Sequence, residues 1–363
     1  MLSNRNAKQD AFHAAPSVSV IVCTRNRGDN ALTAARAILA SEYSDFELLI
    51  MDQSDDDATR RALQPLCAQD GRLRYFRLEL PGKPGALNRA RQEARGRWLA
   101  LTDDDCIPDS KWIGALLTAF EADPKIGVVF GDVRAAPHDN TTGYIPDNPI
   151  TNAKIIYTAR EFLYMPGMIH FGIGANMAVR ADAAEAVQGW DPCIGPGAKF
   201  GNADDHDMAI RLLMAGYALA FCPEAHTTHD GFRLWSESAR DVQHTGYGFG
   251  AAFVKHLRCG KVYYGSLRML RHFGRQIVRH ALQGKRPLGT AFPRGWLRGF
   301  AAALRHPVNK INRTFVKMDA AESRKYGGDF AQLSRRNMPT ERLAADAEPP
   351  APPVGAGRSE ETR

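Results

Sequence analysis

Three consecutive aspartates form the first group of residues that could do chemistry. Asp103, Asp104 and Asp105 directly follow the apolar segment 97–101. Like charges this close repel one another, and a divalent cation or hydrogen-bond donors must neutralise them. Oxygen ligands suit Mg²⁺ or Mn²⁺, which commonly bridge protein carboxylates and a diphosphate. The alternative is that these aspartates only cap a helix that begins near Asp109.

A second carboxylate cluster follows a glycine-rich segment, 195–201. Asp204, Asp205 and Asp207 open a predicted helix that continues to residue 215. A single acidic residue in the first turn of a helix usually compensates the helix dipole, and that is the alternative for each of them. Three such residues exceed what capping needs, so one of them is a candidate general base.

The elements that must position these clusters form a regular series. Apolar, β-branched segments at 17–23, 46–51, 73–78 and 97–101 alternate with helical patterns. This alternation predicts an α/β fold with a doubly wound, mostly parallel sheet. Ligands of such sheets bind beyond the carboxyl ends of the strands. The residues at those ends are Cys23, Thr24, Arg25 and Asn26, then Asp52 and Gln53, then Asp103, Asp104 and Asp105.

The chain resembles the inverting family 2 glycosyltransferases, which have the GT-A fold. The resemblance runs in one consistent order from residue 17 to residue 229, through the segments 17–27, 46–57, 81–90, 101–109, 174–180, 189–212 and 223–229. It implies a metal-dependent enzyme that moves a sugar from a nucleotide-diphosphate donor to a hydroxyl of a glycan or glycolipid acceptor. It also implies a GT-A fold for this part of the chain.

The resemblance implies donor-binding roles for several residues. Lys83 lies where the family contacts the nucleotide, and Asp103 or Asp104 lies near the ribose. The base and ribose are expected against Cys23, Thr24, Arg25, Asn26, Asp52 and Gln53. The family often has an Asp at the position of Gln53, so the identity of the base is open.

The resemblance also implies the metal and catalytic residues. Asp105 is the expected direct ligand of Mn²⁺ or Mg²⁺, and His229 is expected to help hold the metal or the diphosphate, with His226 as the alternative. Asp205 matches the catalytic base. Asp204 replaces a family glutamate and, with Trp190, is a candidate for the acceptor side; Trp235 is a further candidate for stacking on a sugar ring.

The C-terminal part of the chain is strongly basic. Between Asp241 and Asp319 there are 15 Lys and Arg and no acidic residue, whereas the rest of the chain has a net negative charge. Predicted helices at 266–282 and 293–306 combine an apolar stripe with rows of arginines, a pattern typical of binding to an anionic membrane. The alternatives are packing on the acidic body with the arginines in solvent, or nucleic-acid binding. No nucleic-acid partner is expected, because no recognition module is present.

Composition and patterning suggest the domain organisation. Hydrophobic residues make up 44% and charged residues 24% of the chain, which excludes wholesale disorder and a coiled coil. We expect an N-terminal extension (1–15), a GT-A domain (16–232), a basic helical appendage (233–318) and a disordered tail (319–363). With no long apolar segment and no signal peptide, the expected location is cytoplasmic, peripheral on the inner face of the membrane.

Two other functions remain open from the sequence. A sugar nucleotidyltransferase would also use carboxylates and a metal, but a Gly- and Lys/Arg-rich phosphate loop would follow its first strand, where this chain has CTRNRGDN. A sugar-nucleotide-binding protein without catalysis would not need to retain Asp105 and Asp205. The six cysteines lack any CxxC pair and predict neither a zinc site nor a redox motif.

Overall fold

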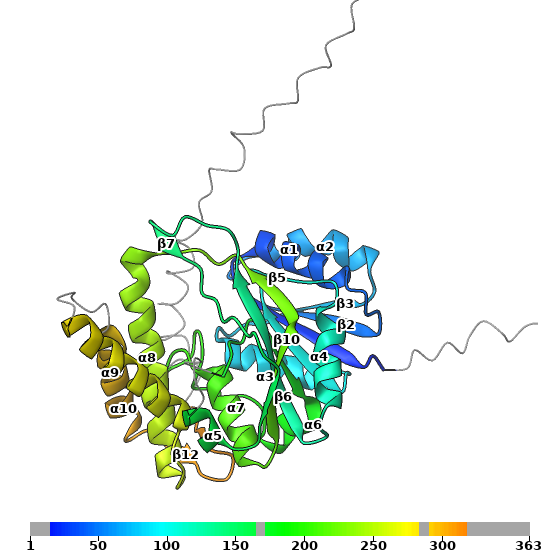
Figure 1. Ribbon diagram of the computed structural model, residues 1–363. Helices are drawn as coiled ribbons and strands as arrows, with labels where there is room; N and C mark the ends of the chain where they lie inside the picture. The colour runs from blue at the N-terminus through cyan, green and yellow to red at the C-terminus, as the bar shows by residue number, and fades with distance from the viewer. Residues whose placement is uncertain (1–14, 165–170, 283–289, 318–363) are drawn as a thin grey trace, which may run out of the picture.

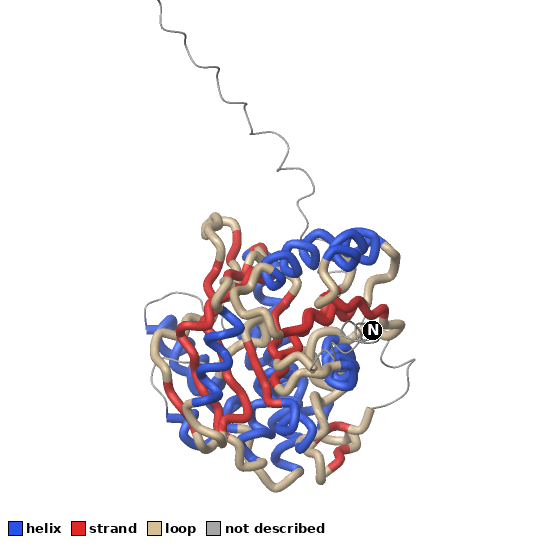
Figure 2. Tube along the Cα trace, turned by 90° about the vertical axis from the view of Figure 1, so that its right-hand side faces the viewer, coloured by secondary structure: helices blue, strands red, loops and turns tan. Residues whose placement is uncertain are grey.

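A computed structural model describes residues 15–164, 171–282 and 290–317. The expected tail (319–363) and nearly all of the expected N-terminal extension lie outside the described residues. The centre of the fold is a nine-stranded sheet with the order β3-β2-β1-β4-β9-β6-β10-β5, in which β8 also pairs with β10. Helices lie on both faces of this sheet, as Figure 1 and Figure 2 show.

The first half of the sheet is parallel and confirms the predicted alternation. Its strands are β1 (Val18–Thr24), β2 (Phe46–Asp52), β3 (Leu73–Arg77) and β4 (Trp98–Asp103). The connecting helices are α1 (Gly28–Leu39), α2 (Ala58–Gln69) and α3 (Lys83–Glu93). All seven residues of β2 are buried, as expected for a strand covered on both faces.

The second half of the sheet is mixed. β9 (Met177–Arg180) runs antiparallel to both β4 and β6 (Ile126–Ala135), and β6 runs parallel to β10 (Ala218–His229). The short strands β5 (Cys106–Pro108) and β8 (Lys154–Ile156) pair antiparallel with β10. A small separate pair joins β7 (Gly143–Tyr144) to β11 (Arg233–Leu234).

Two hydrophobic cores lie on the two faces of the sheet. Helices α1, α2 and α4 (Trp112–Glu121) cover one face. The other face is covered by α3, α6 (Ala181–Ala186), α7 (Asp204–Met214) and α8 (Trp235–Arg258). Residues of β2 alternate between the cores, with Leu48 and Ile50 in the first and Leu49 and Met51 in the second, because successive side chains of a strand point to opposite faces.

The basic region forms α8, α9 (Tyr264–Leu282), α10 (Ala291–Ala303) and a hairpin of β12 (Val308–Asn309) and β13 (Thr314–Phe315). Helices α8 and α10 meet backbone to backbone, because a Cβ on Gly246 or Gly250 would lie 2.3 or 2.0 Å from a carbonyl oxygen of α10. Gly295 and Gly299 face α8 in the same way. Each helix thus contributes a G-x-x-x-G pair, the spacing that allows close helix crossing.

The arginine row expected on the surface of α9 is only partly there. Arg268 is 4% exposed and donates to the carbonyl of Leu163, at the end of α5 (Ala159–Tyr164), over 3.1 Å. Arg271 donates to the same carbonyl over 2.6 Å. Part of the basic region therefore packs on the body of the protein. None of the described helices combines the length and apolar character needed to cross a bilayer.

Candidate active site

The register of the parallel strands brings the expected site residues to one edge of the sheet. Cys23 pairs with Asp103 across β1 and β4, and Thr24 pairs with Asp52 across β1 and β2. A cleft opens at this edge. It is lined by Cys23, Thr24, Arg25, Arg27, Gln53, Gly82, Lys83, Asp103, Asp104, Asp105, Pro196, Gly197, Asn202, His229 and Arg233.

Asp104 is the most buried of the three aspartates at the end of β4. It is 6% exposed, and its two carboxylate oxygens accept hydrogen bonds from Thr24 Oγ1 (2.7 Å) and Arg27 Nη1 (3.0 Å). Burial raises the pKa of Asp104 to about 6, against the lowering effect of the Arg27 guanidinium. Thr24 and Arg27 thus fix the orientation of this carboxylate, which lines the cleft.

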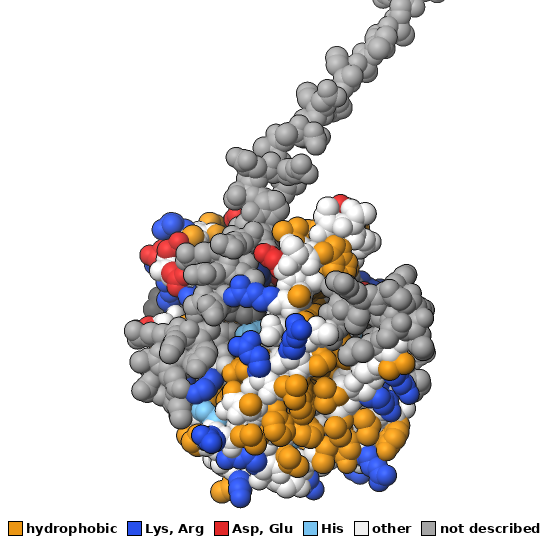
Figure 3. Space-filling model, turned by 90° about the vertical axis from the view of Figure 1, so that its left-hand side faces the viewer, with side chains coloured by type: hydrophobic (Ala, Val, Ile, Leu, Met, Phe, Trp, Pro, Cys, Tyr) orange, Lys and Arg blue, Asp and Glu red, His pale blue; other side chains and the backbone are white. Residues whose placement is uncertain are grey.

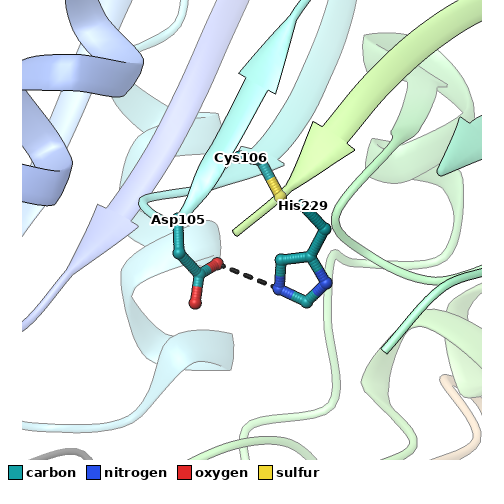
Figure 4. A group of neighbouring side chains, drawn as sticks. All are labelled: Asp105, Cys106 and His229. Carbon is teal, nitrogen blue, oxygen red and sulfur yellow. Dashed lines mark ion pairs between the residues drawn. The ribbon is translucent and has the colours of Figure 1, made fainter. Parts of the chain in front are cut away.

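Asp105 faces His229. Its Oδ1 lies 3.2 Å from His229 Nε2, and its Oδ2 accepts from Arg27 Nη1 over 2.9 Å. Burial opposes ionisation of Asp105, but His229 and Arg27 hold its pKa well below the usual range. His229 Nδ1 donates to the carbonyl of Pro146 over 2.6 Å, so Nε2 points toward Asp105 (Figure 4). A carbonyl that fixes the far nitrogen in this way is the usual second partner of a metal-binding histidine.

The surroundings of this pair leave room for a cation. A Cβ on Gly231 would lie 2.6 Å from Asp105 Oδ2 and 2.8 Å from His229 Nε2, so glycine keeps this space open. The potential ligand atoms of Asp105, Cys106 and His229 lie within 4.8 Å of one another. Burial raises the pKa of the Cys106 thiol well above its usual value, so it stays protonated and binds metal poorly. The carboxylate and imidazole that remain suit Mn²⁺.

Lys83 supplies a second fixed positive charge. It begins α3 after Gly82, and its backbone N–H donates to the carbonyl of Pro196 over 2.9 Å. Its ammonium group forms an ion pair with Asp103. Burial alone would lower the pKa of Lys83, but Asp103 and Asp204 hold it well above its usual range, so Lys83 stays charged in the cleft.

The residues that end β1 and β2 differ in how they reach the cleft. Gln53 Nε2 donates to the carbonyls of Leu80 and Gly82, which leaves its amide oxygen as an acceptor in the cleft wall. Asp52 is fully buried and accepts from the Ser54 N–H (2.8 Å) and the Tyr75 hydroxyl (2.6 Å).

Arg25 and Cys23 line the cleft, whereas Asn26 is held beside it. Arg25 and Asn26 both pair with Asp55, over 3.0 and 2.9 Å. Burial raises the pKa of the Cys23 thiol to about 12, so this side chain stays neutral.

The second carboxylate cluster lies at the start of α7, where the pKa values of Asp204 and Asp205 are shifted in opposite directions. Asp205 accepts from the Gly174 N–H (2.8 Å) and from the backbone N–H (2.7 Å) and Nδ1 (2.8 Å) of His206. Burial opposes ionisation, but these donors and the charge of His206 lower the pKa of Asp205 to about 2. Burial and the adjacent Asp205 raise the pKa of Asp204 to about 7. Near neutral pH, Asp205 is ionised and Asp204 titrates.

The acceptor-side role expected for Trp190 does not fit its position. The indole is 1% exposed in the hydrophobic core beneath the sheet, and Asn88 binds both the backbone N–H and the carbonyl of Trp190 over 2.8 Å. An apolar ring that fills the core offers no face to a sugar. Trp235 is 44% exposed and stacks on Tyr144 with a centroid distance of 4.9 Å.

Several cleft residues were not expected from the sequence. Arg27 bridges Asp104 and Asp105, and Asn202 and Arg233 line the cleft from the glycine-rich segment and β11. The available signal for Arg27 was a basic residue just after β1, the strand that pairs with β4 and its carboxylate cluster. Arg233 had no local signal, because its strand β11 pairs with β7, which is distant in the sequence.

Comparisons with known proteins identify the family. A model of glycosyl transferase family 2 matches residues 19–188. Glycosyltransferase AglE of Haloferax volcanii is 31% identical over 217 residues, which is 59% of this chain and 67% of AglE. The chain belongs to glycosyl transferase family 2. This membership confirms the family that the sequence resemblance implied.

Other relatives of this family 2 glycosyltransferase match shorter segments. GalNAc(5)-diNAcBac-PP-undecaprenol beta-1,3-glucosyltransferase of Campylobacter jejuni is 32% identical over 120 residues, covering 32% of this chain and 38% of the relative. The chain spans less than half the length of several curated relatives that it matches.

A solved structure has the same fold. The mannosyltransferase PcManGT from Pyrobaculum calidifontis, in complex with GDP-Man and Mn²⁺, matches with a TM-score of 0.53 and 20% sequence identity. The match covers 89% of this family 2 chain and 86% of PcManGT. This likeness confirms the expected GT-A type fold.

Proposed function

We propose that this family 2 glycosyltransferase is a metal-dependent, inverting enzyme that transfers a sugar from a nucleoside-diphosphate donor to an acceptor hydroxyl, with Asp205 as the general base. The observation that carries the proposal is the position of Lys83 between the two carboxylate clusters. Lys83 pairs with Asp103, and its Nζ and Asp205 Oδ2 both lie within 4 Å of the point where a Cβ of Gly174 would stand. Both carboxylate clusters thus approach the same lysine, which supports a shared site.

Asp105 and His229 would hold the divalent cation, Mn²⁺ or Mg²⁺. Their carboxylate and imidazole donors, the space kept by Gly231, and the Pro146 carbonyl that fixes His229 Nδ1 all support this assignment. When bound, such a cation neutralises charge that develops on a departing diphosphate. The similar structure of PcManGT contains Mn²⁺ and GDP-Man, which is in keeping with a metal and a nucleoside-diphosphate sugar here.

The donor would lie along the carboxyl ends of β1, β2 and β4. Gln53 offers an amide oxygen to a nucleotide base, and Asp103 or Asp104 lies where a ribose hydroxyl would be bound. Lys83 and Arg27 are fixed cations that would face the diphosphate. Cys23, Thr24 and Arg25 would complete the wall against the nucleoside, with Asn26 and Asp52 supporting them from behind.

Asp205 would take the proton of the attacking hydroxyl. In the proposed reaction a bond forms between the acceptor oxygen and the anomeric carbon, the bond from that carbon to the diphosphate breaks, and the hydroxyl proton passes to Asp205. Attack from the face opposite the leaving group inverts the configuration. The pKa of about 2 keeps Asp205 ionised, and the N–H groups of Gly174 and His206 hold its orientation. Asp204 stands beside it on the acceptor side.

The proposed acceptor is a lipid-linked or polysaccharide glycan. Among the relatives, one is named a glucosyltransferase for GalNAc(5)-diNAcBac-PP-undecaprenol and another a poly-beta-1,6-N-acetyl-D-glucosamine synthase. The proposed location is the cytoplasmic face of an anionic membrane, where such an acceptor is carried. Family membership favours this reaction over the nucleotidyltransferase and non-catalytic alternatives.

The test starts with the donor. A thermal-shift screen of nucleoside diphosphates and their sugars, with and without Mn²⁺, identifies the nucleotide, and NMR of the transferred sugar then gives the anomeric configuration. We expect a metal-dependent rise in Tm for one nucleotide class and an inverted product. A retained configuration, or the same Tm with every nucleotide, would contradict the proposal.

A further inference from the structure

One face of α10 is apolar and exposed. Leu297 and Leu304 are 62% and 50% exposed, and they lie on one stripe of the helix with Ala301, at positions i, i+4 and i+7. The opposite face, with Gly295 and Gly299, is packed against α8. The two leucines are exposed on a helix whose opposite face already packs against α8. They are therefore available to a further partner.

The aromatic residues of α10 pack inward, away from this stripe. Trp296 packs on Phe253 of α8 with a centroid distance of 5.3 Å and stacks on Phe300 at the same distance. The apolar residues of α10 therefore lie on two different surfaces. The aromatic residues pack against α8, and the leucines face outward.

The exposed stripe continues onto neighbouring segments. Ile311, in the turn of the β12–β13 hairpin, is 90% exposed, and Leu257, in the last turn of α8, is 50% exposed. Two hydrogen bonds gather these segments at one end of the helical region. Arg258 Nη1 donates to the carbonyl of Ala303 over 3.0 Å, and Arg313 Nη1 donates to the carbonyl of Cys259 over 3.3 Å.

Positive charge surrounds this apolar surface. Arg294 and Arg298 of α10 and Arg305 just after it are exposed, and Lys310 and Lys317 are exposed on the hairpin and just after it. The whole segment between Asp241 and Asp319 contains no acidic residue. Figure 3 shows the result: hydrophobic side chains gather on the lower part of this face, with Lys and Arg around them and few acidic groups.

We propose that this surface, defined as the outer stripe of α10 with the β12–β13 hairpin and the last turn of α8, binds an anionic lipid bilayer. Leucine and isoleucine side chains would enter the boundary of the acyl chains, and the flanking arginines would lie at the level of the phosphates. Each Lys or Arg near an anionic membrane adds to the attraction. This proposal requires no step of the transfer reaction, so the two can fail separately.

Charge selects a lipid surface over a second copy of the chain. If two copies of the chain associated through this surface, their arginine rows would face and repel each other. The segment between Asp241 and Asp319 has no acidic residue that could neutralise this charge. An anionic bilayer instead supplies both the apolar layer and the negative charge. Exposed apolar patches bordered by polar residues are typical of such interaction sites.

The surface is joined rigidly to the candidate active site. Lys255 of α8 is fully buried and pairs with Asp207 of α7 (2.6 Å) and with Asp191 (2.7 Å). The same Asp191 oxygen accepts the backbone N–H of Phe315, in the hairpin, over 2.8 Å. Binding to a bilayer would therefore hold α7, which carries Asp205, at a fixed height above the lipid.

Vesicle flotation of the full chain tests the proposal. The vesicles contain phosphatidylglycerol and phosphatidylcholine, or phosphatidylcholine alone, at low and high salt. We expect wild-type protein to float with the anionic vesicles at low salt only. Arg298→Glu with Arg305→Glu, and separately Leu297→Ser with Leu304→Ser, should each lower the bound fraction about tenfold or more.

The matched control is Arg36→Glu with Arg61→Glu, which makes the same charge change at exposed positions of α1 and α2, and it should float like the wild type. Thermal melting checks that each variant is folded, and light scattering reports its mass. The proposal is overturned if wild-type protein does not bind anionic vesicles, or if the control weakens binding as much as the Arg298→Glu, Arg305→Glu variant. It is also overturned if the leucine variant changes the mass of the particle rather than its flotation, which would identify an interface between two copies of the chain.

Discussion

Lys83 and Asp205 approach the same side of Gly174. A Cβ at that position would lie 3.4 Å from Lys83 Nζ and 3.9 Å from Asp205 Oδ2. The ammonium also pairs with Asp103, and its charge helps to lower the pKa of Asp205. Asp103 and Asp205, about a hundred positions apart in the chain, thus both lie near the Lys83 ammonium. Because Gly174 has no side chain, the space between Lys83 and Asp205 stays open.

Gly174→Ala tests whether that space is where the acceptor hydroxyl enters. No atom lies closer than 3.4 Å to the added methyl group, so we expect the variant to fold. The methyl would stand between Lys83 and Asp205, and kcat should fall about tenfold or more because small displacements of a reacting group are costly. Donor affinity should change little. Gly114→Ala, on α4 with nothing within 4 Å, is the control and should behave as wild type.

Asp205→Asn should lower kcat about 10²-fold to 10⁴-fold at every pH while leaving donor binding intact, since general-base assistance has this magnitude. Asp204→Asn should behave differently. The pKa of Asp204 is about 7, and its ionised form makes the neighbouring Asp205 a stronger base, so wild-type kcat/KM should rise with pH through about 7. Asp204→Asn should remove that rise. A pH profile of the three proteins decides, and a rise that survives in Asp204→Asn would mean that another group titrates.

The parallel half of the fold could be predicted from the sequence because its information is local. Buried strands such as 46–51 are continuous apolar runs, and each ends at polar residues that the register then aligns, as Cys23 with Asp103. The strand β10 does not end with the apolar run 217–222 but extends to His229, because an irregular register between Cys222 and His226 lets it continue past Pro223. That extension is what brings His229 to Asp105.

The features that could not be predicted from the sequence depend on contacts between distant segments. An aromatic side chain such as Trp190 can stack on a sugar ring, and only the packing of the core shows that this one is buried. The outer and inner faces of α10 could not be separated by periodicity alone, since both contain apolar residues. The G-x-x-x-G spacings at 246–250 and 295–299 were the available signal for the helix crossing. Asp207 had no local signal for its buried partner Lys255.

Removing the divalent cation with a chelator should abolish transfer, and Mn²⁺ should restore it. His229→Gln and Gly231→Ala should each raise the Mn²⁺ concentration needed for half-maximal activity about tenfold or more. The first variant loses the imidazole ligand, and in the second a Cβ lies 2.6 Å from Asp105 Oδ2.

The control for the metal site is His226→Gln. His226 pairs with Asp132 over 2.8 Å rather than with Asp105, so this variant should need no more Mn²⁺ than the wild type. An unchanged Mn²⁺ requirement in His229→Gln together with a raised one in His226→Gln would transfer the metal role to His226.

The buried pair of His256 and Asp207 predicts a loss of stability in mild acid. His256 is fully buried and donates from Nε2 to Asp207 Oδ1 over 2.8 Å, and burial lowers its pKa from 6.5 to about 4. Between these values the unfolded chain binds a proton that the folded chain does not, so the free energy of unfolding rises with pH and falls on acidification. The full effect of this one group is about 3 kcal/mol.

His256→Gln should remove this contribution, because the amide N–H can donate to Asp207 without titrating. Urea unfolding at pH 7 and pH 4 measures it. We expect the wild type to lose about 3 kcal/mol more than the variant between the two pH values, since every other titrating group is common to both proteins. Equal losses would show that the imidazole is protonated in the folded protein, and that Asp207 then carries a charged partner on α8 in addition to Lys255.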